Sequence, residues 1–354
     1  WKKRIGLLWH RILMFLVILG PGLITASADN DASGIATYSM AGSVYGYKFL
    51  WIILWVTVGE IVVQEMAARM GVATGKGLTD LVREEYGVKP TLWVMLGLML
   101  ANFGTTTAQF AGIAAASEMF GVSRYIAVPV VALGIWLLVL RGSYRHIEKV
   151  LLVLCLYAFS YVASGILVKP DWTAVARNTL VPQMIRERGY LLAVLATVGT
   201  TITPWRAAYM QATVADKGVK KEEYHYTRID VAFGALMGNV VSAFIIIATA
   251  ATLHTAGISV DTAGEAARAL APLAGQWAEV LFAGGLLGAS VLAASVLPLS
   301  TTYAVCEAFG WERGVNHSRR EAPVFYNLYT AQIVLGVAIV LIPGIGKDVN
   351  GARR

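Results

Sequence analysis

The sequence predicts an all-α integral membrane protein in which two membrane-crossing segments are interrupted. Hydrophobic residues make up 57% of the 354 residues and charged residues only 14%, and the mean hydropathy is +0.62. Such a composition suits a chain whose surroundings are mostly hydrocarbon. The interruptions are polar, glycine-containing stretches, at residues 29–34 (Asp-Asn-Asp-Ala-Ser-Gly) in the first segment and 199–204 (Gly-Thr-Thr-Ile-Thr-Pro) in the sixth.

Apolar runs long enough to cross roughly 30 Å of hydrocarbon recur about nine times along the chain. The first run carries a polar break and no small-residue cleavage site, so we expect it to remain in the mature protein. The runs lie near residues 11–45 (interrupted), 48–70, 91–120, 125–140, 147–168, 188–214 (interrupted), 230–254, 276–308 and 324–344.

The two breaks predict a binding site inside the membrane. A backbone that leaves helical geometry at this depth exposes N–H and C=O groups that lipid cannot satisfy, so it must be buried in protein or face a wet cavity. In many transporters the chain consists of two inverted halves, and each half begins with a broken span. The binding site of such transporters lies near the bilayer midplane. We therefore expect a single transmembrane domain over residues 1–354, with a first repeat at 11–168 and a second at 186–345. Five spans followed by four predict that a tenth span is absent from this chain.

Basic residues in the connecting loops predict the orientation. Most fall on one side of the predicted spans, which the positive-inside rule makes the cytoplasm, so we expect a multi-pass protein of the plasma or inner membrane with a cytoplasmic N-terminus. The net charge of +7 then reflects contact with anionic lipid, and no basic groove points to nucleic acid. One loop, with Lys169, Arg177, Arg186 and Arg188, lies on the other side. The basic residues of the main group are Lys2, Lys3, Arg4, Arg11, Arg69, Lys76, Arg83, Lys89, Arg141, Arg145, Lys149, Lys217, Lys220, Lys221, Arg228, Arg313, Arg319 and Arg320.

Three short strings occur in order on these spans. They are Gly20-Pro21-Gly22 before the first break, residues 68–76 (Ala-Arg-Met-Gly-Val-Ala-Thr-Gly-Lys) after the second span, and residues 196–198 (Ala-Thr-Val) entering the sixth. Together they resemble the Nramp metal-ion transporters, over most of the chain. The resemblance implies a LeuT-like fold, with two inverted five-helix repeats and discontinuous helices 1 and 6, and divalent-cation transport by alternating access.

The sequence departs from the family pattern at both breaks. Where the family has Asp-Pro-Gly-Asn, residues 31–34 read Asp-Ala-Ser-Gly, and where it has Ala-x-x-Met-Pro-His, residues 200–205 read Thr-Thr-Ile-Thr-Pro-Trp. A thioether favours softer transition metals, whereas the Thr203 hydroxyl is a hard oxygen donor. We expect the small Gly34 to leave room for the waters that Mg²⁺ keeps. The sequence therefore resembles the Nramp-related magnesium transporter branch, and we expect Mg²⁺, and also Mn²⁺, as the transported ions.

The candidate ligands come from the same two stretches. Asp31 supplies the anionic charge, although an aspartate at this position can instead cap the following half-helix. Thr203 supplies a hydroxyl, which as the residue before Pro204 can equally be committed to an N-cap. The carbonyls of Gly199 and Thr200 form the negative end of a half-helix, where a cation is favoured.

The residues that carry protons in the family are replaced. Its acidic pair in Thr-Asp-x-Ala-Glu aligns with Thr106 and Gln109, and its histidine aligns with Trp205. None of the three replacements can titrate as the family's acids and histidine do, so we expect transport without proton coupling, driven by the membrane voltage.

Three further polar residues are predicted at membrane depth: Asp29, Glu60 and Arg206. Burying them unpaired costs several kcal/mol, so they need partners or water. We favour a structural Glu60–Arg206 pair. The alternative is that Asp29 and Glu60 form an acidic vestibule that attracts hydrated cations.

Other functions stay open as alternatives. The first is a proton-coupled transporter of transition metals such as Mn²⁺ and Fe²⁺. A more distant one is a sodium-coupled amino-acid transporter, although two aspartates at the break repel a substrate carboxylate. We expect no enzyme and no cofactor, because the spans hold no nucleophile–base or metal-ligand cluster and Cys155 and Cys306 are isolated. The oligomeric state stays open.

Overall fold

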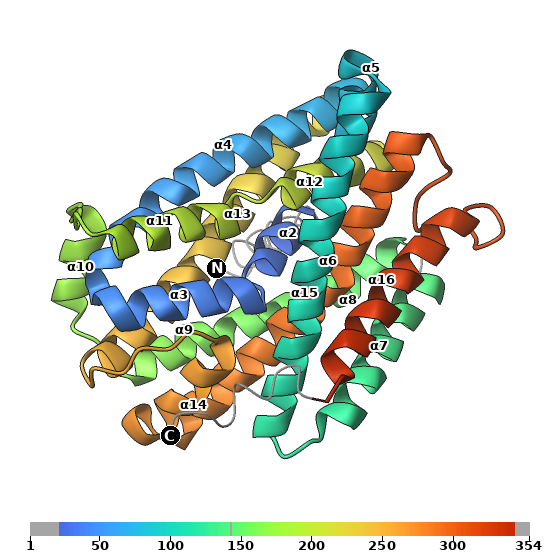
Figure 1. Ribbon diagram of the computed structural model, residues 1–354. Helices are drawn as coiled ribbons and strands as arrows, with labels where there is room; N and C mark the ends of the chain where they lie inside the picture. The colour runs from blue at the N-terminus through green and yellow to red at the C-terminus, as the bar shows by residue number, and fades with distance from the viewer. Residues whose placement is uncertain (1–20, 142–143, 344–354) are drawn as a thin grey trace, which may run out of the picture.

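The computed structural model describes residues 21–141 and 144–343, and in these ranges the chain forms helices and no strands (Figure 1). The basic residues before Gly20, Gly20 itself and the tail after Pro343 lie outside the described residues. The helices are α2 (Pro21–Asp29), α3 (Ala32–Tyr45), η1 (Gly46–Phe49), α4 (Leu50–Thr74), α5 (Leu78–Tyr86), α6 (Val88–Met119), α7 (Arg124–Arg141), α8 (Tyr144–Leu154), η2 (Cys155–Tyr157), α9 (Ala158–Leu167), α10 (Trp172–Leu180), α11 (Arg188–Thr201), α12 (Pro204–Asp216), η3 (Lys221–Glu223), α13 (Tyr224–Thr249), the π-turn η4 (Ala250–His254), α14 (Ala263–Ala274), α15 (Gln276–Phe309) and α16 (Pro323–Leu341).

Both predicted interruptions are breaks between two half-helices. The first separates α2 from α3 and the second separates α11 from α12. These halves have 9, 14, 14 and 13 residues. At about 1.5 Å per residue, no half reaches across roughly 30 Å of hydrocarbon, so two halves together make one crossing. Among the described residues, seven helical segments are long and apolar enough to cross, and one of them, Ala32–Thr74, runs from α3 through α4.

Local chemistry explains where each break falls. At the first, Asp31 has an extended backbone, with φ −77° and ψ −178°, and caps α3. Asn30 beside it is tied to α13: its side-chain amide donates to the Gly238 carbonyl at 2.7 Å and accepts from the Ser242 hydroxyl at 2.6 Å. At the second break, Pro204 is the first residue of α12, and its ring and missing N–H prevent α11 from continuing.

Small residues bring the first half-helix against the centre of the bundle. A Cβ built on Gly234 of α13 comes within 2.4 Å of the Gly22 carbonyl oxygen, and one on Gly238 within 2.9 Å of the Ala26 oxygen. Only glycine therefore permits this approach of α2 to α13. The close packing fixes Asp29 and Asn30 in the interior of the protein.

The two ends of the bundle differ in the contacts between their side chains. At the end that carries α5, uppermost in Figure 1, basic side chains tie the loops together: Lys217 pairs with Glu148 at 2.7 Å and Arg313 with Asp80 at 2.6 Å. At the opposite end, the rings of Tyr45, Phe49 and Tyr190 pack within 6 Å of one another, and Trp51 donates to the Tyr190 hydroxyl at 3.0 Å. One end thus has ion pairs between its loops, and the other has a cluster of aromatic rings.

Candidate functional site

The two helix breaks lie against each other in the middle of the bundle. The hydroxyls of Tyr38 on α3 and Thr201 at the end of α11 are hydrogen-bonded at 2.8 Å. The Thr203 hydroxyl donates to Oδ1 of Asp29 at 3.3 Å. Residues more than 160 positions apart therefore meet at one place, as the sequence predicts for paired breaks.

A cavity of about 490 Å³ opens beside both breaks. Its walls include Asp29, Asp31 and Ser33 from the first break and residues 199–200 and 203–205 from the second. The remaining lining comes from α5, from Ala208 of α12 and from residues 93–105 of α6. The part of the wall that α5 contributes lies at the end with the basic loops, whereas Tyr45, Phe49 and Tyr190 do not belong to the wall.

Three hydrogen-bond donors orient the Asp31 carboxylate in the absence of any ligand. One oxygen, Oδ1, accepts from the Ser33 hydroxyl at 2.6 Å and from the Gly34 N–H at 2.7 Å, which is the N-cap of α3. The other, Oδ2, accepts from the Gln109 amide at 2.9 Å. Asp31 thus caps the half-helix, which is one of the two predicted roles, and it also lines the cavity. Its role as an ion ligand stays a prediction.

Gln109 has a position that the sequence reasoning missed. It is fully buried on α6 and its amide spans the first break: the oxygen accepts from the Ala32 N–H at 2.9 Å, while the nitrogen donates to Asp31 and to the Thr105 carbonyl. A glutamate here would lack the N–H that reaches Asp31. The available signal was the stripe of Asn102, Thr105 and Gln109, which recurs at helical spacing on one face.

The second break offers mainly backbone and hydroxyl oxygens. Thr203 is the N-cap of α12, as predicted, but its side chain makes no capping bond and points to Asp29 instead. The Thr200 carbonyl has no N–H four residues later, because that residue is Pro204. Thr200 and Gly199 both line the cavity, so the candidate oxygen donors of the two breaks face one space.

The expectation that Gly34 leaves room for metal-bound water is wrong. Gly34 is buried and does not belong to the cavity wall. A Cβ built on it lies 2.9 Å from the Asp29 carbonyl oxygen, so the missing side chain lets α3 begin against the end of α2. Its N–H serves the Asp31 cap.

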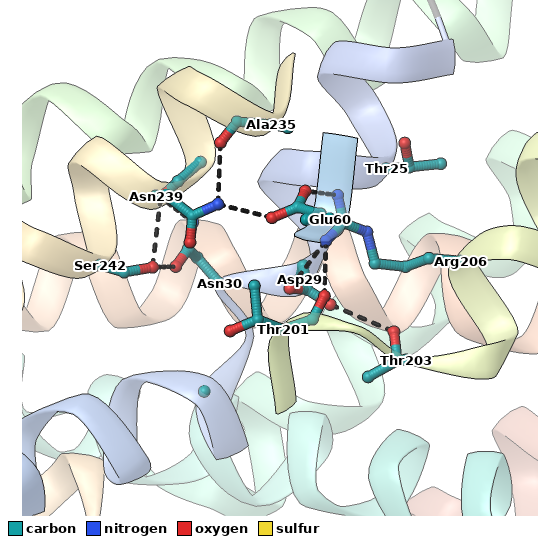
Figure 2. A network of polar contacts seen from close by, with 12 residues as sticks. Thr25, Asp29, Asn30, Glu60, Thr201, Thr203, Arg206, Ala235, Asn239 and Ser242 are labelled. Carbon is teal, nitrogen blue, oxygen red and sulfur yellow. Dashed lines mark hydrogen bonds and ion pairs between the residues drawn. The ribbon is translucent and has the colours of Figure 1, made fainter. Parts of the chain in front are cut away.

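Arg206 is paired with two carboxylates (Figure 2). Its Nη1 donates to Asp29 Oδ2 at 3.0 Å and to the Thr201 carbonyl at 2.9 Å, and its Nη2 donates to Glu60 Oε1. Glu60 also accepts from the Asn239 amide at 2.5 Å. The structure thus contains the Glu60–Arg206 pair favoured from sequence, and it adds Asp29 as a second anion on the same guanidinium.

The two other positions that align with the family's proton-carrying residues, Thr106 and Trp205, differ in their relation to the cavity. Trp205 is buried and lines the cavity, whereas Thr106 is fully buried and is not part of the cavity wall. In the ranges that the structure describes, no three His, Cys, Asp or Glu side chains gather as a metal cluster. An ion in this cavity would therefore be held by few carboxylates, completed by carbonyls, hydroxyls and water.

Comparison with known proteins identifies the family. The sequence profile described as Nramp, natural resistance-associated macrophage protein-like, matches residues 22–351. This chain belongs to the Nramp family. It is 29% identical over 299 residues to the divalent metal cation transporter MntH of Bacillus subtilis (strain 168), covering 80% of this chain and 69% of the relative. It is 30% identical over 285 residues to MntH of Erwinia tasmaniensis, covering 77% and 68%.

Solved structures show the same fold. The manganese transporter of Eremococcus coleocola, in complex with an aromatic bis-isothiourea substituted compound, superposes with a TM-score of 0.72 at 22% identity, covering 94% of this chain and 73% of that one. A variant of the same transporter gives a TM-score of 0.71 at 20% identity, covering 92% and 77%. The predicted LeuT-like fold is confirmed. These relatives are transporters and not enzymes, as the sequence predicts for this chain.

Proposed function

We propose that this protein carries a divalent metal ion across the membrane, with Mg²⁺ as its main substrate and Mn²⁺ as a second one, by alternating access and without moving protons. The observation that carries the proposal is the chemistry of the cavity wall. Its polar side chains offer oxygen and amide groups, and no Met, Cys or His lines it among the residues that the structure describes. Oxygen ligands suit Mg²⁺, whereas thioether and imidazole favour softer metals.

The cavity is large enough for an ion that keeps its water. A water molecule occupies about 30 Å³ in the liquid, so six waters around Mg²⁺ need about 180 Å³ by the same measure, well below the 490 Å³ of the cavity. Mg²⁺ dehydrates reluctantly and usually binds through one or two carboxylates. Asp31, with Asp29 beside it, supplies that number.

The absence of proton coupling is supported by the groups around Asp31. Its carboxylate accepts from the Gln109 amide, the Ser33 hydroxyl and the Gly34 N–H, and none of these groups releases a proton at neutral pH. Voltage alone can drive uptake, because each elementary charge gains about 2.3 kcal/mol per 100 mV. A divalent ion gains twice that.

We also propose that the basic-loop end faces the cytoplasm, which places the N-terminus there and makes the cavity open inward. The two predicted repeats, 11–168 and 186–345, then each begin with one broken helix, α2–α3 and α11–α12. Both halves contribute to the cavity. Alternating access would move these halves relative to each other.

Purified protein in liposomes tests the proposal. Uptake of Mg²⁺, Mn²⁺ and Ca²⁺ is compared, with a pH dye inside and the voltage set by a K⁺ gradient. We expect Mg²⁺ uptake that grows as the inside is made negative and leaves the lumenal pH unchanged. Acidification that tracks uptake, above that of protein-free liposomes, would instead identify a proton-coupled transporter. Uptake of Mn²⁺ with no uptake of Mg²⁺ would contradict the substrate assignment.

A further inference from the structure

Arg206 lies where a second cation would be expected to bind. Its side chain is 1% exposed, and its guanidinium contacts the carboxylates of Asp29 and Glu60 and the carbonyl of Thr201. These groups come from three other helices, α2, α4 and α11. A cluster of two carboxylates and one carbonyl at membrane depth is an oxygen-lined cation site, and here a side chain fills it (Figure 2).

Helix ends reinforce the preference of this position for positive charge. Thr201 is the last residue of α11, and Asp29 is the last residue of α2. The C-terminal end of a helix carries about half a negative charge from its unpaired carbonyls. Two such ends therefore meet near the guanidinium, in addition to the two carboxylates. A cation at this position is therefore stabilising.

The formal charges around the breaks match one divalent ion. Asp29, Asp31 and Glu60 contribute three negative charges and Arg206 one positive charge, so the sum is minus two. One bound divalent cation brings it to zero. Without the guanidinium the sum would be minus three, and a divalent ion alone would leave one buried negative charge uncompensated, which is costly in a low-dielectric interior.

The guanidinium is not placed for maximal stability. Its Nε is buried and has no hydrogen-bond partner in the structure, and an unsatisfied buried donor carries a desolvation cost. What its position does achieve is contact with two carboxylates, of which Asp29 lines the cavity. Through Asp29, it is also linked to the Thr203 hydroxyl, which accordingly lies next to a neutralised carboxylate.

We propose that Arg206 is a tethered cation: it occupies the second cation position beside the divalent-ion site and so permits transport of one divalent ion without a co-transported monovalent ion. The inference rests on the proposed function and extends it to the stoichiometry. It makes Arg206 a positioning and specificity residue that acts through Asp29 and does not itself touch the transported ion.

Chemical rescue tests the proposal. In Arg206→Ala the guanidinium is removed and a space of its shape is left, so Mg²⁺ uptake into liposomes is expected to fall about tenfold or more, in the range typical for losing a group that supports a metal ligand. Guanidinium chloride on both sides should restore uptake, whereas choline chloride at equal ionic strength should not. The matched control is Arg124→Ala, which removes a guanidinium paired with Glu118 outside the cavity. That variant should respond to neither salt.

A double variant that restores the total charge separates the effect of the Arg206 charge on uptake from the effect of its structural contacts. Asp29→Asn combined with Arg206→Ala restores the sum of minus two, carried by Asp31 and Glu60. We expect the double variant to take up Mg²⁺ faster than Arg206→Ala and to be indifferent to guanidinium. If Arg206 only holds the helices together, the double variant should instead take up Mg²⁺ no faster than Arg206→Ala, since it removes more contacts. Equal or slower uptake than the single variant would therefore overturn the inference, as would a lack of guanidinium rescue in a folded Arg206→Ala protein.

Two further measurements keep the outcome decisive. If Arg206→Ala does not fold, Arg206→Lys is used, because this variant keeps the positive charge. It should transport Mg²⁺ without a monovalent co-ion. Mg²⁺ uptake that requires a monovalent cation in this variant would contradict the proposal. Failure of the proposed function has a different signature, because the unmodified protein would then take up no Mg²⁺ at all. Uptake by the unmodified protein combined with charge-insensitive variants rejects the tethered cation alone.

Discussion

The two helix breaks are built in different ways. The first is held by side chains: Asp31 accepts three hydrogen bonds, Gln109 bridges the break, and Asn30 is anchored to α13. The second is enforced by the backbone through Pro204, and the Thr203 hydroxyl next to that proline makes a single bond of 3.3 Å. The first break therefore presents a preorganised carboxylate, and the second presents carbonyls and a weakly held hydroxyl.

From this difference we expect the two breaks to have different roles in ion binding. Preorganised charge provides affinity because no reorganisation is needed when the ion arrives. Adaptable carbonyl and hydroxyl groups instead permit the ion to keep or exchange water. We expect substitutions at the first break to change whether an ion binds, and those at the second to change which ion is preferred.

The largest effect is expected at Asp31. Asp31→Ala should abolish Mg²⁺ uptake, because it removes the charge that offsets dehydration of the cation, and it should also cost about 1 kcal/mol of stability through the lost cap. Asp31→Asn keeps a capping side chain but not the charge, so it should be more stable than the alanine variant and equally inactive. Uptake and thermal unfolding of both variants are measured side by side. Near wild-type uptake by either protein would remove Asp31 from the site.

Gln109 should rank next. Gln109→Leu leaves the Ala32 N–H unpaired and frees one Asp31 oxygen from its donor, so Mg²⁺ affinity should fall about tenfold to a hundredfold. Gln109→Glu should also weaken binding, because a carboxylate cannot donate to Asp31 and repels it. Calorimetric titration with Mg²⁺ gives the affinities. Gln332→Leu is the matched control, since Gln332 bonds α15 away from the cavity; an equal loss in this variant would indicate a general folding defect.

At the second break, a change of preference is expected with less loss of transport. Thr203→Met adds a thioether beside the ion path and should shift the Mg²⁺-to-Mn²⁺ uptake ratio several-fold toward Mn²⁺. Thr203→Val removes the hydroxyl without adding a ligand and is the control. Adding Gly34→Asn should not strengthen the shift, because its side chain meets the Asp29 carbonyl and destabilises the break. An unchanged ratio in Thr203→Met would count against the ligand assignment.

The fold and the place of the site could be predicted from the sequence, because both depend on local signals. Apolar runs give the spans, and Pro204 and the Asp-Asn-Asp stretch mark the breaks. The hydrogen-bonding partners depend instead on contacts between distant residues: Gln109 reaches Asp31 across 78 positions, and Arg206 reaches Asp29 across 177. Sequence could identify Gln109 as a residue unable to titrate but not as the group that orients Asp31. The prediction that Gly34 leaves room for water was wrong for the same reason. Only the packing shows that a side chain at this position would contact the Asp29 carbonyl.

The smallest effect is expected from the anchor of the first break. Ser242→Ala removes the hydroxyl that donates to the Asn30 side chain at 2.6 Å, but the Asn30 amide still donates to the Gly238 carbonyl. A typical hydrogen bond contributes about 1 kcal/mol, so the unfolding temperature should fall by a few degrees while the Mg²⁺-to-Mn²⁺ ratio stays constant. Ser295→Ala is the control, because the Ser295 hydroxyl bonds only the backbone of its own helix in the structure. If Ser242→Ala changed the ion ratio while Ser295→Ala did not, the first break would also set selectivity, and the division between affinity at one break and preference at the other would have to be abandoned.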